Sequence, residues 1–235
     1  MSDITVVLVH GAFAESSSWN GVIARLHAAG HRTIAAANPL RSLTGDAAAV
    51  SSVVGSISGP VVLAGHSYGG AVITNAATGH DNVRGLVFVA AFAPERGESI
   101  AALTGLRPGS TLGESLQPVP LPDGSTDLYI RQDLFPAQFA ADVPAGEAAL
   151  LAVTQRPLSD VALHEGSGAP AWRSLPSWFV VPGLDRNIPV ETQRWMAERA
   201  GATGVVELDG ASHAVTVSRP AEVADAITKA IAAIG

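Results

Sequence analysis

The most constraining feature of this sequence is a Gly-His-Ser-Tyr-Gly pentapeptide at residues 65–69. The apolar run before it, residues 60–64, is typical of a short buried strand. The small residues that follow, 70–77, favour a tightly packed helix. A G-x-S-x-G sequence between a strand and a helix forces the serine into a strained turn that exposes its hydroxyl. The pattern therefore predicts that Ser67 is a nucleophile, and not merely a serine in a Gly-rich loop.

A second β-branched apolar run, residues 4–9, is followed by a His-Gly-Ala sequence that starts at His10. After such a strand, this sequence delivers a backbone N–H that forms an oxyanion hole together with the N–H after the nucleophile. We therefore predict Ala12 and Tyr68 as the two donors, with Phe13 as the alternative to Ala12. His10 is interpreted as a structural residue that holds the loop, and not as a catalytic base.

Two further strand ends supply the other groups that a serine nucleophile needs. His213 and Asp185 each lie shortly after an apolar, strand-like segment, and we predict that they are the base and the acid. The order Ser67, Asp185, His213 along the chain is the order expected for a catalytic triad at the edge of a parallel sheet. Asp209 and Glu95 are the alternatives for the acid.

Apolar strand-like segments alternate with helical segments along most of the chain. This alternation indicates a parallel sheet that is covered on both faces. Because the crossovers are right-handed, the loops after the strands meet along one edge of the sheet, where we expect Ser67, Asp185 and His213. The predicted fold class is α/β, with a six-stranded, mostly parallel, doubly wound sheet. The predicted strands are residues 4–9, 32–37, 60–64, 84–90, 177–181 and 205–208.

The alternation stops between residues 94 and 173, where prolines concentrate. A segment this long without regular alternation is usually a functional insertion. We predict a core formed by residues 1–93 and 174–235, with residues 94–173 inserted as a helical cap over Ser67. Its apolar residues are candidates for the wall of a pocket: Leu103, Leu106, Leu112, Leu116, Leu121, Tyr129, Leu134, Phe135 and Phe139.

Composition narrows the classes of partner. The chain has 235 residues, of which 47% are hydrophobic and 15% charged, and this suits one compact domain. A net charge of −7, with Lys229 as the only lysine, argues against nucleic-acid or membrane partners. Without cysteine, and with scattered histidines, we expect neither a metal nor another cofactor. The sequence begins without a targeting signal, so we expect a cytoplasmic protein with a small-molecule ester substrate, and a homodimer is left open.

Four motifs together resemble the α/β-hydrolase superfamily. They are the His-Gly-Ala sequence at 10–12, Gly-His-Ser-Tyr-Gly-Gly at 65–70, Asp-Arg-Asn-Ile-Pro at 185–189 and Gly-Ala-Ser-His at 210–213. Within the superfamily the chain is most similar to the compact branch of esterases and hydroxynitrile lyases, which includes plant methylesterases of the salicylate-binding type. The similarity extends over essentially the whole chain and implies the α/β-hydrolase fold.

The resemblance implies a triad of Ser67, His213 and Asp185 and oxyanion N–H groups from Ala12 and Tyr68. The reaction expected of such a triad requires no cofactor.

One departure from the lyase members favours hydrolysis. Those members carry Thr directly after the strand-terminal His and Lys directly after the catalytic His, whereas this chain has Gly11 and Ala214. Without that ammonium group, nothing obvious stabilises a departing cyanide. The predicted function is a serine carboxylesterase that cleaves small, neutral, moderately hydrophobic esters through an acyl-Ser67 intermediate. The alternatives are a lyase or cofactor-free perhydrolase on the same triad, or a non-catalytic small-molecule receptor.

Overall fold

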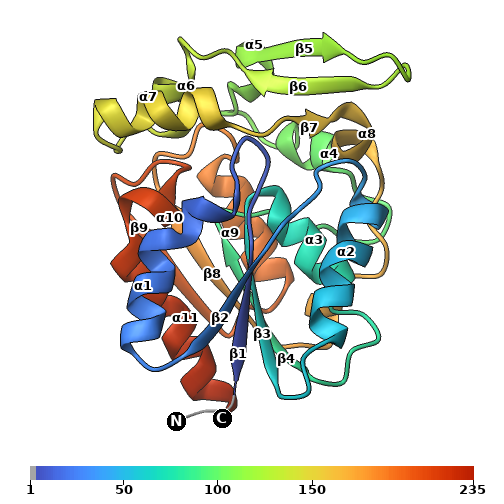
Figure 1. Cartoon of the computed structure of the whole chain (residues 1–235), viewed down its shortest axis with the longest axis vertical. Coiled ribbons are helices and arrows are strands. Elements are labelled where there is room, and N and C mark those ends of the chain that lie inside the picture. Colours follow the sequence, from blue (N-terminus) through green and yellow to red (C-terminus); the bar gives the residue numbers. More distant parts are fainter. Residues whose placement is uncertain (1–3) are drawn as a thin grey trace.

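A six-stranded parallel sheet forms the centre of the protein, as a computed structural model that describes residues 4–235 shows (Figure 1). The strands lie in the order β2-β1-β3-β4-β8-β9, and every neighbouring pair is parallel. The predicted sheet is confirmed. Its strands are β1 (Thr5–Val9), β2 (Arg32–Ala36), β3 (Val61–His66), β4 (Val83–Val89), β8 (Ser177–Pro182) and β9 (Gly204–Leu208).

Successive strand residues point to opposite faces of the sheet, and each face has its own core. Val7 and Phe88 pack with α2, α3 and α9 on one face, whereas Val6 and Val87 pack with α1 and α11 on the other. Because both faces are buried at the centre of the sheet, β1, β3, β4 and β8 are apolar at most positions, whereas the edge strands β2 and β9 are partly exposed. The helices of these two layers are α1 (Asn20–Ala28), α2 (Leu43–Gly55), α3 (Tyr68–Ala76), α9 (Val190–Arg199) and α11 (Pro220–Ile234), with the short η1 (Ser16–Trp19) and α10 (Val215–Ser218) between them.

The segment between β4 and β8 forms a smaller layer across the carboxyl ends of the parallel strands (Figure 1). It therefore lies over the loops that follow β1, β3, β8 and β9. Its helices are α4 (Ile100–Thr104), α5 (Leu112–Ser115), α6 (Phe135–Phe139), α7 (Ala145–Thr154) and α8 (Asp160–His164), and its strands are β5 (Leu116–Pro120), β6 (Thr126–Ile130) and β7 (Leu158–Ser159). The chain then returns to β8 through the short η2 (Ala171–Arg173), which contacts α3.

These three strands are the part of the fold that the sequence did not reveal, because we expected a helical cap. They form an antiparallel sheet in the order β5-β6-β7. Pro118 and Pro120 lie in β5, and prolines normally argue against a strand. They are tolerated here because β5 is an edge strand, so their missing N–H groups cost no central ladder bonds. The turn that joins β5 to β6 contains Gly124, whose φ of 87° suits glycine.

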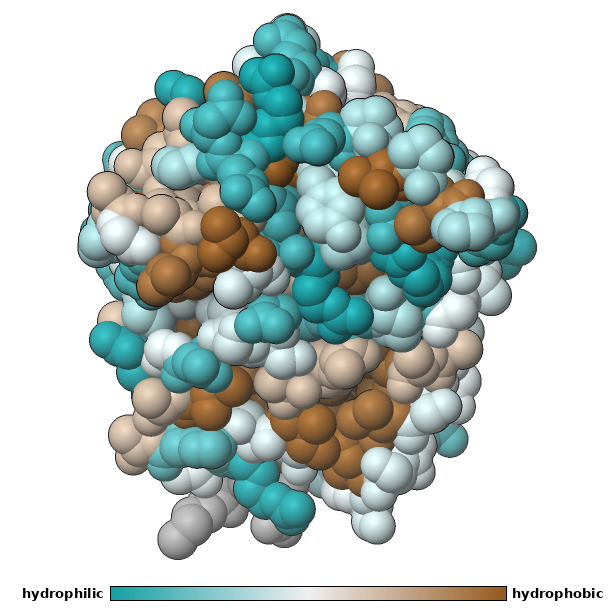
Figure 2. Space-filling view, turned by 45° about the horizontal axis from the view of Figure 1, so that its top comes forward, coloured by the Kyte–Doolittle hydropathy of each residue, from teal (hydrophilic) through white to brown (hydrophobic). Residues whose placement is uncertain are grey.

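The outer face of this layer is mixed in character. Figure 2 turns the layer towards the viewer and shows hydrophobic residues in separate patches with polar residues between them. Leu150 and Val153 of α7 are 65% and 59% exposed, respectively. The layer therefore presents no continuous apolar surface on this face.

Candidate active site

Ser67 occupies a strained turn between β3 and α3. Its φ of 53° lies in the left-handed region, which a non-glycine residue adopts at a cost of about 1–3 kcal/mol. Ser67 is the last residue before the helix, and it is 6% exposed. Its carbonyl accepts hydrogen bonds from the N–H groups of Gly70 and Phe92, at 3.0 and 3.2 Å. These contacts hold the turn in the conformation that the G-x-S-x-G pattern predicts.

Two glycines allow the turn to pack directly on neighbouring backbone. A Cβ at Gly65 would lie 2.4 Å from the carbonyl oxygen of Gly69, and a Cβ at Gly69 would lie 2.4 Å from that of Val9. Both distances are shorter than any ordinary carbon–oxygen contact, so only glycine fits at either position. The turn is therefore fixed by the sheet and by its own helix.

The loop after β1 lies beside this turn and carries the predicted oxyanion donors. The N–H of Phe13 donates to the carbonyl of Arg156 at 3.0 Å, so it is not free to bind a substrate oxygen. Within residues 4–235, the N–H of Ala12 donates to no other residue. The N–H of Tyr68 is at the first position of α3, where a helix offers no acceptor. Ala12 and Tyr68 thus remain the predicted donors, whereas Phe13 is no longer a candidate.

His10 holds this loop in the way its structural interpretation requires. Its Nδ1–H donates to the carbonyl of Gly11 at 3.0 Å, and its Nε2 accepts the N–H of Asn38 at 3.1 Å. The Asn38 side chain donates in return to the His10 carbonyl, at 2.9 Å. Burial lowers the pKa of His10 to about 4, so the ring is neutral near pH 7 and Nε2 stays available as an acceptor.

His213 and Asp185 form a buried pair. Nδ1–H of His213 donates to Asp185 Oδ2 at 2.7 Å, and the two side chains are 1% and 0% exposed. The other oxygen, Oδ1, accepts the N–H groups of Asn187 and Ile188 at 2.8 and 2.9 Å. With Nδ1 committed to the carboxylate, Nε2 of His213 is the ring nitrogen that can accept a proton.

The alternative acids do not take part in this pair. Asp209 is exposed at the turn after β9. Glu95 forms an ion pair with Arg173, which holds the pKa of Glu95 below its usual range. Of the three candidates, Asp185 is the carboxylate that contacts His213.

Gln193 is a member of the site that sequence reasoning missed. Its Nε2 donates to Asp185 Oδ2 at 2.9 Å and to the carbonyl of Ile188 at 2.8 Å, and the residue is 1% exposed. The available signal was weak: a glutamine one turn after Pro189, on the helix that follows the acid. It fixes the carboxylate that in turn fixes His213.

Ser67 and His213 are connected through His66. Nε2–H of His66 donates to the carbonyl of His213 at 2.9 Å, and the two ring centroids are 4.8 Å apart. Burial lowers the pKa of His66 to about 3, so this ring is neutral too. Among residues 4–235 no hydrogen bond joins Ser67 Oγ to His213 directly. Such bonds are often long without a substrate and tighten in the complex.

A second missed contact lies behind Tyr68. Its hydroxyl donates to Asp46 Oδ2 at 2.7 Å, and Asp46 Oδ1 accepts the N–H of Arg41 at 3.1 Å. Burial raises the pKa of both Asp46 and Tyr68. The side chain of Tyr68 is thereby anchored in α2, while its backbone N–H stays at the start of α3.

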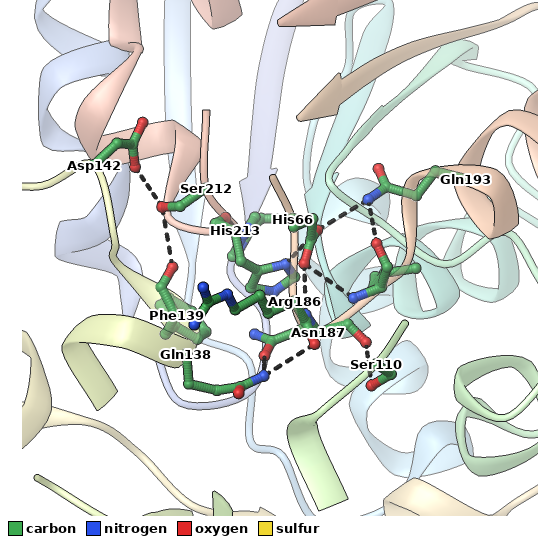
Figure 3. A network of polar contacts seen from close by, with 12 residues as sticks. His66, Ser110, Gln138, Phe139, Asp142, Arg186, Asn187, Gln193, Ser212 and His213 are labelled. Carbon is green, nitrogen blue, oxygen red and sulfur yellow. Dashed lines mark hydrogen bonds and ion pairs between the residues drawn. The ribbon is translucent and has the colours of Figure 1, made fainter. Parts of the chain in front are cut away.

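Helix α6 of the inserted layer contacts the loops that carry the acid and the base (Figure 3). The Phe139 carbonyl accepts the N–H of Ala214 at 2.9 Å, and its ring meets the His213 ring edge-on, with centroids 4.8 Å apart. Ser212 donates to Asp142, just beyond the same helix. Gln138 binds the loop after Asp185. The inserted layer is therefore part of what holds the acid–base pair.

A mostly apolar cavity lies beside Ser67. It contains about 410 Å³ of unfilled space, including its solvent-open mouth. Of the wall residues predicted from sequence, Leu112 and Leu116 line it, whereas Leu106 is 48% exposed. The complete lining is Ala12, Phe13, Ser67, Tyr68, Phe92, Ile100, Leu112, Leu116, Leu128, Leu158, Leu163 and Asn187.

Neither a metal cluster nor a spanning helix is found in the part of the chain that the structure describes. Within residues 4–235, no three His, Cys, Asp or Glu side chains are grouped so that they could hold a metal ion. None of the helices in that range has the length and apolar character needed to cross a membrane.

Known proteins are similar to this chain in sequence along nearly its whole length. The pattern of the alpha/beta hydrolase family matches residues 6–226. Esterase PIR7B of Oryza sativa subsp. japonica is 30% identical in an alignment that covers 95% of this chain and 94% of that protein. Salicylic acid-binding protein 2 of Nicotiana tabacum is 28% identical in an alignment that covers 91% of this chain and 92% of that protein.

The fold is shared with solved structures as well. Polyneuridine aldehyde esterase superimposes with a TM-score of 0.82 at 22% identity, over 97% of this chain and 99% of that one. The resemblance expected from the four sequence motifs, to plant esterases of the salicylate-binding type, is confirmed.

Proposed function

The chain belongs to the alpha/beta hydrolase family, and on this premise we propose that it is a serine-dependent carboxylic ester hydrolase. The observation that supports this most is an apolar cavity with Ser67 in its wall, next to a buried His213–Asp185 pair. A non-catalytic receptor does not require a serine in a strained turn, which costs stability, or a buried imidazole whose tautomer a carboxylate fixes.

The proposed reaction has two steps. Ser67 Oγ attacks the ester carbonyl carbon while His213 Nε2 accepts the hydroxyl proton, and the Asp185 carboxylate stabilises the imidazolium. The tetrahedral intermediate collapses, its bond to the alkoxy oxygen breaks, and His213 returns the proton to the leaving alcohol. Water then attacks the acyl-Ser67 carbonyl carbon and gives a proton to His213, which passes it to Ser67 Oγ as the carboxylic acid leaves.

Backbone N–H groups stabilise the oxyanion in both steps. Those of Ala12 and Tyr68 are the proposed donors, each worth about 2.7–4 kcal/mol of transition-state stabilisation. Tyr68 is also at the positive end of the α3 dipole, which adds to the attraction for an oxyanion.

The lining of the cavity favours neutral substrates. A carboxylate-bearing ester would need a cation in the wall, and no arginine or lysine of the described chain lines this cavity. Arg156 is half-buried, and the other arginines of the inserted layer are exposed: Arg96, Arg107, Arg131 and Arg173. We therefore propose small, neutral, moderately hydrophobic esters as the substrate class.

Replacement of the nucleophile tests the proposal. Ser67→Ala should lower kcat on p-nitrophenyl butanoate by roughly 10⁶-fold and abolish labelling by a fluorophosphonate, with the fold intact. Ser52→Ala, which removes an exposed hydroxyl on α2, is the matched control and should keep full activity. Ester turnover that persists in Ser67→Ala would refute the nucleophile. A wild-type protein that binds esters without turnover would identify a receptor instead.

An acyl-length series tests the substrate class. The limited cavity and the absence of a continuous apolar face in Figure 2 predict a maximum of kcat/KM at short p-nitrophenyl esters. A maximum at about C12 or longer would show that the protein binds lipid-like chains.

A further inference from the structure

Three residues bring polar side chains into the otherwise apolar cavity: Ser67, Tyr68 and Asn187. Ser67 is the proposed nucleophile, and the Tyr68 hydroxyl already donates to Asp46 at 2.7 Å. Asn187 is therefore the side chain whose contribution to the cavity the proposed reaction does not explain.

Three of the four polar groups of Asn187 have partners. Its N–H donates to Asp185 Oδ1 at 2.8 Å, and its carbonyl accepts the Ser110 hydroxyl at 2.9 Å. Oδ1 accepts Nε2–H of Gln138 at 2.7 Å. Within residues 4–235 Nδ2 has no hydrogen-bond partner, although the residue is only 2% exposed. Nδ2 is not among the fully enclosed polar atoms, so it reaches the open space of the cavity, where a ligand acceptor can take its hydrogen bond in place of water.

The orientation of this amide follows from its neighbours (Figure 3). Gln138 faces both the carbonyl of Arg186, at 3.0 Å, and the Asn187 side chain. A carbonyl can only accept, so the Gln138 atom between them must be the NH₂ group. The Asn187 atom that meets it must then be oxygen. Thr111 completes the relay, because its hydroxyl donates to Gln138 Oε1 at 2.7 Å.

We propose that Asn187 Nδ2–H donates a hydrogen bond to the substrate, and that the preferred ester carries a further acceptor oxygen besides the two oxygens of its scissile ester group. An ether or ketone oxygen in the acyl or the alkoxy part meets this requirement. The inference rests on the proposed ester hydrolysis and names its substrate class more closely. A site that offers a buried donor discriminates against an analogue in which CH₂ replaces the acceptor.

Matched ester pairs measure this preference. p-Nitrophenyl methoxyacetate and p-nitrophenyl butanoate differ by one oxygen in the acyl part, and 2-methoxyethyl acetate and butyl acetate differ likewise in the alkoxy part. The readout is the ratio of kcat/KM for the oxygen-containing ester over its hydrocarbon partner. Comparing this ratio between variants cancels the intrinsic reactivity of the two esters.

Asn187→Leu removes the donor at similar volume and should lower the ratio on the order of tenfold in one of the two series. Gln138→Met leaves Asn187 in place but removes the donor that orients its amide, and should lower the same ratio by a smaller factor. Ser110→Ala removes the bond to the Asn187 carbonyl and the bond from the Leu112 N–H, but neither involves the Asn187 amide, so it should leave the ratio unchanged whatever its effect on stability.

The outcomes separate this inference from the proposed function. A wild-type protein that hydrolyses none of the four esters contradicts ester hydrolysis itself. Hydrolysis with the same ratio in wild type, Asn187→Leu and Gln138→Met, in both series, overturns the role of Asn187 alone. If thermal unfolding shows that Asn187→Leu does not fold, the ratio in Gln138→Met decides, and a ratio equal to that of wild type overturns the role.

Discussion

The turn that carries Ser67 and the loops that carry Asp185 and His213 are held in different ways. The serine turn packs backbone against backbone, with Gly65 and Gly69 at distances that admit no Cβ. The loops of Asp185 and His213 have backbone contacts too, but they are also held by side chains of the inserted layer, from α6 and from Asp142 just beyond it. The proposed nucleophile therefore depends on local sequence and on the sheet, whereas the proposed acid–base pair also depends on residues far away in the chain.

The difference shows that the residues of one candidate site can be positioned in two ways, by close packing of the backbone and by hydrogen bonds between side chains. Close backbone packing leaves few alternative conformations, so the serine turn needs little support from side chains. Side-chain hydrogen bonds are individually weaker and depend on both partners, so the acid and base need several of them at once.

The largest expected effect concerns the acid–base side. Asp185→Asn should lower kcat by about 10⁴-fold, because the amide no longer fixes the His213 tautomer or stabilises its charged form. Asp209→Asn and Glu95→Gln are the controls and should stay near wild-type activity. Steady-state kinetics with p-nitrophenyl butanoate measure all three. If Glu95→Gln or Asp209→Asn is the crippled variant, the acid is assigned wrongly.

The next effect concerns the serine turn. Gly69→Ala places a Cβ against the Val9 carbonyl and should lower the free energy of unfolding by at least about 3 kcal/mol. Gly146→Ala in α7 of the inserted layer adds the same methyl where nothing lies within 4 Å, and should be neutral or stabilising by up to about 1 kcal/mol. Urea unfolding measures both. Equal free energies of unfolding in the two variants would contradict the conclusion that close backbone packing holds the serine turn.

The smallest effect is a pH dependence of the free energy of unfolding that arises from His10 and His66, which lie beside the turn of Ser67. Burial lowers the pKa of His10 to about 4 and of His66 to about 3, against an ordinary value of 6.5. Between pH 6.5 and 4 the unfolded chain binds more protons than the folded one. The contribution of these histidines to the free energy of unfolding is therefore complete above pH 6.5 and is lost as the pH is lowered. The loss is about 2 kcal/mol for each of the two histidines at pH 5.

A variant isolates this contribution, because the raised pKa of the buried Asp46 acts in the opposite direction. Urea unfolding of His10→Gln at pH 7.5 and pH 5 should show a loss smaller than that of wild type by about 2 kcal/mol. His27→Gln, which replaces an exposed histidine, should behave like wild type. An unchanged pH dependence in His10→Gln would mean that His10 is charged in the folded protein.

Sequence reasoning succeeded where the determining contacts are local or follow from topology. The central strands are apolar at nearly every position because both of their faces are buried, so the apolar runs at residues 4–9 and 60–64 predict strands. The serine turn is encoded within five consecutive residues. Asp185 was preferred from its place after a strand, and the structure brings it to His213.

The same reasoning failed where a contact joins distant side chains without a periodic pattern. Gln138 binds Asn187 across 49 positions, and Tyr68 binds Asp46 across 22. The choice between Ala12 and Phe13 depends on the Arg156 carbonyl, which no pattern near the first strand could indicate. The small antiparallel sheet was hidden for another reason, because its edge strand carries prolines that only an edge position tolerates.

The contacts of α6 bear on how such a protein can be changed by engineering. Recombining the inserted layer between relatives is an obvious route to new specificity, since this layer supplies much of the cavity wall. Here the graft would also carry Gln138, Phe139 and Asp142, which hold the acid and base loops of the recipient. A chimera would therefore inherit part of its catalytic rate along with its substrate preference, unless these three residues are changed back to those that fit the recipient core.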